Sequence, residues 1–204
     1  MKKFIFSIFA LSLISLNVDA QSIEPELGVN LGSVRQKVGN TIKNSDGLLT
    51  WGFGVNWKPY VAENLYLKPG LFYTTTGFSE RIANLTHITK ISYVQVPLLL
   101  GYDFPIGDGG YDGTIFTEAG AYLGYALGGK RTVGSVNSNI EFGDKANQYS
   151  PLDYGLKFGL GYVAPFNIFL KGQYNLGLAN ASNVSNVSIT NRYFNLSLGY
   201  RIAL

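Results

Sequence analysis

His87 is the single histidine of the 204-residue sequence and the side chain best suited to act as a general base near neutral pH. Ser79, Glu80 and Ser92 lie close to it in the chain. Nucleophilic catalysis requires a hydroxyl within hydrogen-bond distance of such a base. A lone histidine in a loop is more often inert, so we expect no catalytic residue. A small lipid-modifying surface enzyme built on His87 remains an alternative.

Two other segments have the composition of ligand-binding loops. Residues 124–131 (GYALGGKR) nearly match a phosphate-binding loop, but Arg131 replaces the required serine or threonine and no helical pattern follows. Asp108-Gly109-Gly110 offers too few oxygen ligands for calcium and is typical of a turn. The chain has no cysteine, which together with a single histidine argues against a zinc site. We therefore predict neither a metal nor a cofactor.

Composition narrows the class of protein further. Glycine is abundant at 25 residues, whereas charged residues make up only 14% of the chain, against ~25% in average proteins. The net charge of +3 is small and the basic residues are dispersed, so we exclude nucleic acid as a partner. After residue 20 no segment reaches 18 consecutive apolar residues, which excludes a helical membrane protein.

The first twenty residues have the three parts of a secretory signal peptide. Lys2 and Lys3 precede an apolar run at 4–16, and Val18 and Ala20 occupy the positions that signal peptidase reads. The run is too short for a transmembrane helix, which needs ~20 residues. We predict a signal peptide at 1–20, Sec-type export, cleavage after Ala20 and one domain at 21–204.

Residues 152–162 (LDYGLKFGLGY) alternate without exception between two kinds of position. One parity holds leucine, tyrosine and phenylalanine, and the other holds Asp153, Lys157 and glycines. A period of two predicts an extended strand with two different faces. The same alternation predicts eight strands, at 25–34, 49–60, 64–79, 89–105, 113–129, 149–164, 167–179 and 191–203. Pro97 cannot donate to a ladder and predicts a bulge or local break.

The polar faces combine glycine with balanced charge. Glycine has no reason to be abundant on a face that meets water, whereas inside a closed barrel it makes room for long side chains. Paired charges in that lumen avoid the cost of buried unpaired ions. We predict an all-β, eight-stranded antiparallel up-and-down transmembrane β-barrel with an apolar exterior and a filled polar lumen, rather than a soluble lipocalin-like barrel or sandwich. The predicted lumenal network is Glu26, Lys58, Lys68, Asp103, Glu118, Asp153, Lys157, Lys171 and Arg201, with Asp153 or Glu118 as the partner of Lys157.

Short and long connections alternate along the chain. The short ones fall at 61–63, 106–112 and 165–166, and the long ones at 35–48, 80–88, 130–148 and 180–190. Transmembrane barrels place short turns in the periplasm and long loops outside. The long connections and their flanks are rich in basic residues, which we expect to meet lipopolysaccharide phosphates. The candidate contacts are Arg35, Lys37, Lys130, Arg131 and Arg192.

Several strands resemble those of the PorT-type outer-membrane barrels of Bacteroidota, which are Gram-negative. Residues 93–100 (YVQVPLLL) are similar to the most specific strand of that family. Residues 65–73 (LYLKPGLFY), 153–162 (DYGLKFGLGY) and 172–178 (GQYNLGL) resemble three others. The resemblance spans essentially the whole chain after residue 20, and it implies a fold and a location in the outer membrane more than an activity.

The last strand resembles the signal that the barrel assembly machinery reads, through Ser197, Gly199, Tyr200 and Ile202, although the chain ends in Ala203-Leu204 without a terminal aromatic residue. We expect a non-enzymatic barrel of the cell outer membrane, surrounded by lipids and lipopolysaccharide. Its extracellular loops would be the interaction surface for an unknown protein partner or would stabilise the envelope. A narrow pore or a secretion accessory component is a further alternative.

Overall fold

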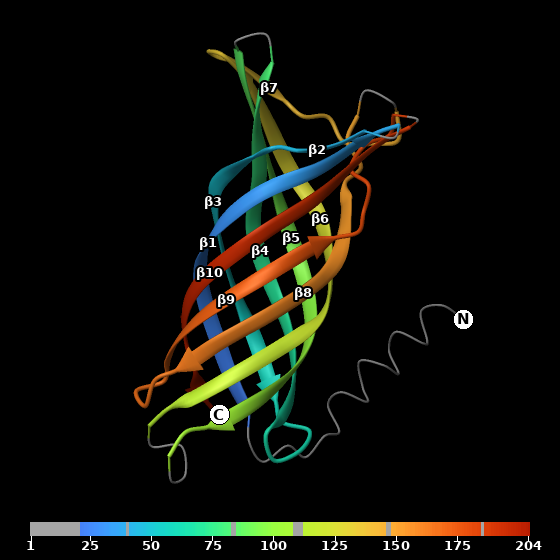
Figure 1. Cartoon of the computed structure of the whole chain (residues 1–204). Helices are drawn as coiled ribbons and strands as arrows, with labels where there is room; N and C mark the ends of the chain where they lie inside the picture. The colour runs from blue at the N-terminus through green and yellow to red at the C-terminus, as the bar shows by residue number, and fades with distance from the viewer. Residues whose placement is uncertain (1–20, 40, 83–84, 108–111, 146–147, 185) are drawn as a thin grey trace, which may run out of the picture.

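The computed structural model describes residues 21–39, 41–82, 85–107, 112–145, 148–184 and 186–204, which form one antiparallel sheet closed on itself (Figure 1). No helix in these ranges has the length and apolar character needed to cross a membrane. The predicted signal peptide at 1–20 and the predicted turn at Asp108-Gly109-Gly110 lie outside the described residues.

Eight long strands make the wall of the barrel, and each pairs with its neighbours in the order of the chain. The sheet closes where β1 pairs with β10, so the eight-stranded up-and-down barrel is confirmed. The long strands are β1 (Gln21–Val38), β3 (Asp46–Pro59), β4 (Leu65–Ile82), β5 (Leu85–Pro105), β6 (Thr114–Val133), β8 (Leu152–Val163), β9 (Ile168–Gly177) and β10 (Val187–Tyr200). Three short strands, β2 (Thr41–Asn44), β7 (Val136–Asn139) and β11 (Ile202–Ala203), pair with β1, β6 and β1.

The strands run further toward the long connections than the sequence predicted. β1, β4 and β6 continue to Val38, Ile82 and Val133, and β2 and β7 fold back on β1 and β6 as hairpin extensions (Figure 1). Much of what was predicted as loop is therefore paired strand. Both faces of these extensions meet water, so the alternation that reveals a strand at a membrane is lost there.

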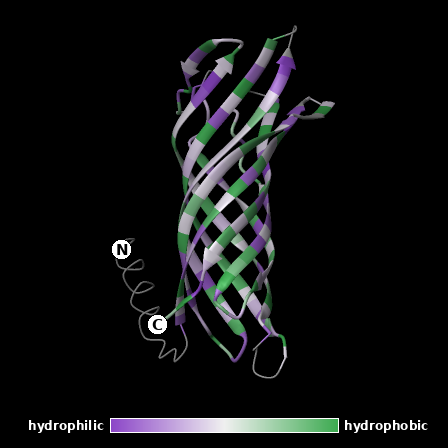
Figure 2. Ribbon diagram, turned by 90° about the vertical axis from the view of Figure 1, so that its left-hand side faces the viewer, coloured by the Kyte–Doolittle hydropathy of each residue, from purple (hydrophilic) through white to green (hydrophobic). Residues whose placement is uncertain are grey.

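Apolar side chains cover the outside of the wall, and polar ones fill the inside. In β8 the leucine, tyrosine and phenylalanine positions are exposed, while Asp153 and Lys157 are 2% and 5% exposed. Figure 2 shows hydrophobic and hydrophilic residues alternating along the strands. Such an exterior suits hydrocarbon, and the closed ladder gives the backbone groups of the wall partners from neighbouring strands, as hydrocarbon demands. The predicted facing of the strands is confirmed.

Lumenal glycines lie directly opposite large lumenal side chains on the next strand. Gly54 pairs with Phe72, Gly101 with Tyr66, Gly161 with Phe116 and Gly199 with Phe169. In each pair, ring atoms of the aromatic residue occupy the space that a Cβ on the glycine would need. The aromatic rings thus cover bare backbone, and the glycines let large residues fit inside a narrow barrel.

Two irregularities interrupt the ladder around β5. Its pairing with β4 stops after Pro69–Leu98 and resumes at Phe72–Gln95 without a change of register, which is the local break predicted at Pro97. The bulge lies elsewhere, because Ser92 pairs with Gly128 and Tyr93 with Ala126, which leaves Leu127 of β6 as the extra residue. The side chains of β6 change faces at this bulge.

The facing of β8 predicts how two substitutions in one strand differ. Leu156→Arg, which places a cation against the hydrocarbon core, should lower the free energy of unfolding by about 2–4 kcal/mol. Leu152→Arg, at the end of the strand near the long connections, should cost only about 0–1 kcal/mol. Denaturant unfolding of both variants in lipid vesicles measures the difference, and equal costs would contradict the placement of the membrane along the barrel.

The glycine–aromatic pairs predict a second contrast. Gly101→Ala should lower the free energy of unfolding by about 1–3 kcal/mol, because the added methyl group displaces the Tyr66 ring. Gly128→Ala is the control, since a Cβ there would have nothing within 4 Å. The temperature at which each variant loses its compact form on unboiled SDS gels is a convenient measurement. An unshifted transition in Gly101→Ala would show that the ring does not need this space.

Candidate functional site

Eight charged side chains form one continuous chain of alternating sign inside the barrel. Each ion pair shares a member with the next, and all members except Arg201 are buried. In spatial order they are Lys58, Asp103, Arg201, Glu24, Lys68, Glu118, Lys171 and Glu26. We call this set the lumenal charge chain.

The contacts of the lumenal charge chain are short throughout. The first four pairs have N–O distances of 2.6 Å (Lys58–Asp103), 3.1 Å (Arg201–Asp103), 2.7 Å (Arg201–Glu24) and 2.6 Å (Lys68–Glu24). The remaining pairs are at 3.1 Å (Lys68–Glu118), 3.1 Å (Lys171–Glu118) and 2.8 Å (Lys171–Glu26). Charges buried at this depth are tolerated only when each has opposite partners and further hydrogen bonds. Here the six inner members each contact two opposite charges.

The chain connects most of the barrel wall. Its members come from β1, β3, β4, β5, β6 and β9, and Arg201 follows β10. Strand alternation aims each side chain inward, and closure brings together residues that lie far apart in sequence. Tyr60 adds a hydrogen bond to Asp103, and the Lys58 ammonium lies 3.8 Å from the centre of the Tyr66 ring. The lumenal charge chain therefore fills the end of the barrel that carries the short turns.

Glu24 is the member that the sequence analysis missed. It is 1% exposed and links Arg201 to Lys68, yet the predicted first strand begins only at residue 25. Extending the alternation of β1 by one inward position, from Glu26 to Glu24, would have found it. With Glu24 included, the lumenal charges of the described residues are five cations and five anions, so their formal charges cancel.

The sequence analysis predicted Asp153 or Glu118 as the partner of Lys157, and this prediction was wrong. In the described structure its ammonium lies within ion-pair distance of neither Asp153 nor Glu118, and it donates instead to Oε1 of Gln95 at 3.1 Å. Asp153 accepts from Tyr122 at 3.2 Å and from Asn191 at 3.4 Å. β8 thus contributes one cation and one anion that are held by neutral groups rather than by each other.

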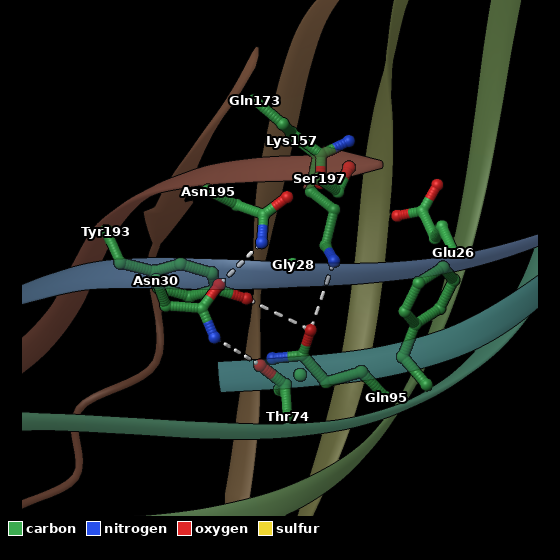
Figure 3. Close-up of a pocket in the computed structure, with 12 residues that line it drawn as sticks. Glu26, Gly28, Asn30, Thr74, Gln95, Lys157, Gln173, Tyr193, Asn195 and Ser197 are labelled. Carbon is green, nitrogen blue, oxygen red and sulfur yellow. Dashed lines mark hydrogen bonds between the residues drawn. The ribbon is translucent and has the colours of Figure 1, made fainter. Parts of the chain in front are cut away.

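Between the lumenal charge chain and the end with the long connections, amides and hydroxyls fill the centre of the barrel. Figure 3 shows these side chains. Gln95 accepts from both Lys157 and Tyr193, and Asn30 donates to Thr74 and accepts from Asn195. The cavity that these residues line has a volume of about 20 Å³, which is room for roughly one water molecule. The centre of the lumen is therefore filled.

An apolar cluster occupies the mouth at the end with the long connections. Ile91, Tyr93 and Ala126 are buried there against three residues of the segment that follows β7, namely Ile140, Phe142 and Tyr149. Arg131 donates to the Tyr149 hydroxyl at 2.7 Å and lies over its ring. Ile140, Phe142 and Tyr149 therefore lie over the polar lumen at this end of the barrel.

The predicted lipopolysaccharide contacts divide into two groups. Arg35, Lys37 and Arg192 share the outward parity of the apolar residues of β1 and β10, and Lys130 lies outward after the bulge in β6. Arg131 does not share this outward position. The bulge turns it toward the mouth, where it donates a hydrogen bond to Tyr149, so the predicted contact of Arg131 with lipopolysaccharide is corrected. All five lie in strands: Arg192 lies in a strand as predicted, and the other four lie in strand rather than loop because β1 and β6 extend further than predicted.

The residues around His87 do not form a catalytic arrangement in the described structure. His87 pairs with Glu80 across β4 and β5, and these two share the inward parity. Ser79 and Ser92 have the opposite parity, so their hydroxyls point away from the imidazole. The segment 124–131 is continuous β6 strand, and the described residues include no cluster of metal ligands.

The four residues of the predicted assembly signal lie beside the closure of the barrel. Ser197 is buried and faces inward, while Tyr200 and Ile202 are exposed on the outside. Gly199 lies under the Phe169 ring and pairs with Glu26 across the junction of β10 and β1.

The lumenal charge chain predicts a large cost for removing one charge. Glu118→Gln keeps the shape of the side chain but leaves Lys68 and Lys171 short of one anion each, so we expect a loss of about 3–5 kcal/mol in the free energy of unfolding. Glu63→Gln, in the short turn after β3, is the matched control and should change stability by less than about 0.5 kcal/mol. Urea unfolding followed by tryptophan emission measures both. Equal midpoints for the two variants would contradict the role of the chain.

Comparison with solved structures finds several similar proteins. The attachment invasion locus protein Ail of Yersinia pestis aligns over 90% of this chain and 98% of its own, with 17% identity and a TM-score of 0.41. OprG of Pseudomonas aeruginosa aligns over 91% of this chain and 96% of its own, with 13% identity and a TM-score of 0.49. Neisserial surface protein A aligns over 87% and 96%, with 14% identity and a TM-score of 0.45. No curated protein matches the chain in sequence.

One family covers most of the sequence. Its sequence pattern, described as "Outer membrane protein beta-barrel domain", matches residues 19–183. The match begins just before β1 and ends after β9, so it includes seven of the eight wall strands. The protein belongs to the outer membrane protein β-barrel domain family and is a protein of the cell outer membrane.

Proposed function

We propose that this protein is a non-enzymatic, plugged outer-membrane barrel of the PorT type, and that its extracellular end is an interaction surface for a protein partner. The observation that supports this proposal is the filled lumen. The lumenal charge chain, the amide and hydroxyl layer and the apolar cluster succeed one another along the barrel, and the central cavity holds about 20 Å³. In the described part of the chain the centre of the lumen is filled, so the surfaces available for binding lie on the outside of the wall and at its ends.

The extracellular hairpins and loops offer apolar side chains above the membrane. Ile42, Leu85, Val136 and Val184 are 50%, 50%, 69% and 46% exposed, and we call them the tip residues. They come from β2, β5, β7 and the connection after β9. Apolar side chains that meet water on four segments at one end of the barrel are available for contact with a protein partner.

The alternatives of a pore and an enzyme have less support. Eight strands leave an interior just wide enough for side chains, and here the side chains are joined by ion pairs. An enzyme built on His87 would need a hydroxyl nearby, whereas Ser79 and Ser92 lie on the other face of their strands. A lipid-modifying activity would therefore require residues other than these.

The proposed route to the membrane begins with Sec-type export directed by residues 1–20 and removal of this signal peptide. The barrel assembly machinery would then read the last strand through its outward aromatic and apolar residues, Tyr200 and Ile202. The PorT resemblance supports a source among the Bacteroidota. The mature domain would comprise residues 21–204.

Photo-crosslinking in intact cells tests the interaction surface. A photoreactive residue at Val136 or Val184 should yield a discrete protein adduct, whereas one at the lipid-facing control position Leu198 should not. The same Val136 adduct should be lost when Leu85 and Ile42 are replaced by serine. Protein adducts from Leu198 alone, or none from any tip residue, would contradict partner binding by this end.

Planar bilayer recording tests the plugged lumen directly. The purified barrel should show no steps of conductance above the leak of the bilayer. Glu118→Gln, if it folds, loosens the lumenal charge chain and is the variant in which transient openings are expected. Steady conductance of the unmodified protein would favour the pore instead.

A further inference from the structure

Two lysines lie directly opposite one another on the outside of the wall. Lys90 of β5 pairs with Lys130 of β6, and both have the outward parity of the lipid-facing residues beneath them. Both are exposed. Directly opposed residues have Cβ atoms about 4.5–5.5 Å apart, so like charges repel at this position. Neither lysine makes an ion pair within the described residues.

The residues below the two lysines form a graded surface. One step toward the membrane on the same face lie Thr75, Ser92 and Gly128, and the two hydroxyls are 3.1 Å apart. One further step down lie Tyr73, Val94 and Leu127, of which Leu127 is 59% exposed. Each step of two residues is about 7 Å along a strand. The surface therefore passes from cationic to hydroxylic to apolar over the thickness of a lipid headgroup region.

A groove accompanies this gradient. Its volume is about 580 Å³, and it is lined by Lys90, Lys130, Ser92, Thr75, Leu127 and Tyr73 among others. Gly128 makes the hollow, because it adds no side chain and has nothing within 4 Å of where a Cβ would be. On the far side Asn139 of β7 pairs with Lys130 and adds an amide.

We propose that this groove binds one lipopolysaccharide molecule, with a lipid A phosphate between Lys90 and Lys130 and an acyl chain along Tyr73 and Leu127. A phosphate offers several acceptor oxygens to two ammonium groups at once and cancels their repulsion. The Thr75 and Ser92 hydroxyls lie where the sugar of the headgroup would be. The outer leaflet of the outer membrane supplies a glycolipid of this chemistry, and the cations lie just above the apolar belt that marks that leaflet.

Lipid binding to the folded protein in neutral detergent tests the proposal by native mass spectrometry. The unmodified protein should bind bisphosphorylated lipid A at least about 10-fold more tightly than lipid A stripped of its phosphates, as expected for charge-assisted contacts. Lys90→Ala with Lys130→Ala should abolish that preference. Lys90→Arg with Lys130→Arg should keep most of it.

The control removes the same charge elsewhere. Arg81→Ala with Lys145→Ala, two exposed cations outside the groove, should leave the preference within about 2-fold of the unmodified protein. Equal losses in the two alanine pairs would mean a diffuse charge effect and would overturn the site. So would equal binding of dephosphorylated lipid A. Displacement of lipid A by millimolar inorganic phosphate would also overturn it, because the site would then hold a free anion.

The fold of every variant is checked by its heat-dependent migration on SDS gels. All the substituted residues are exposed, so each variant should migrate as the unmodified protein does. The proposal depends on the outer-membrane location and not on a protein partner, so loss of the crosslinks from the tip residues would leave it unaffected.

Discussion

The sealed lumen of this barrel imposes one constraint: no charge inside can be left without an opposite charge or a hydrogen-bonding partner. The lumenal charge chain meets it by arranging four cations and four anions so that every inner member touches two opposite charges. Because its members come from six wall strands and from Arg201, the chain fixes the register of those strands relative to one another. Glu118 touches two lysines and also accepts a hydrogen bond from Gln173, so one substitution there disturbs three contacts.

Space is the second demand of a narrow barrel, and glycine meets it. An aromatic ring lies over the glycine opposite in four cross-strand pairs, so the ring needs no room at the axis. The remaining width is taken by amides, hydroxyls and the charges, which leaves room for about one water. A barrel filled in this way has a wall that meets lipid and ends that meet water, and its interactions with other molecules are made on those surfaces.

The bulge at Leu127 links the fold to the outer surface. Along β6 the odd positions up to Leu127 face outward, and continuing that alternation would have placed Arg131 against the membrane and Lys130 at the mouth. The extra residue reverses this order. Lys130 therefore joins Lys90 on the lipid side, while Arg131 holds Tyr149 over the lumen. One inserted residue thus separates the two roles of neighbouring cations.

The sequence by itself determined the solvent on each side of the wall, because a period of two is a local property and glycine beside balanced charge is explicable only inside a barrel. The sequence was sufficient to predict the eight wall strands, the direction in which their side chains face and the lumenal residues that it named. Only the tertiary structure decided which charges pair, that Lys157 turns to Gln95 and that Arg131 faces the mouth. These depend on register and on a bulge, which arise from pairing between distant strands and leave no periodic trace along the chain.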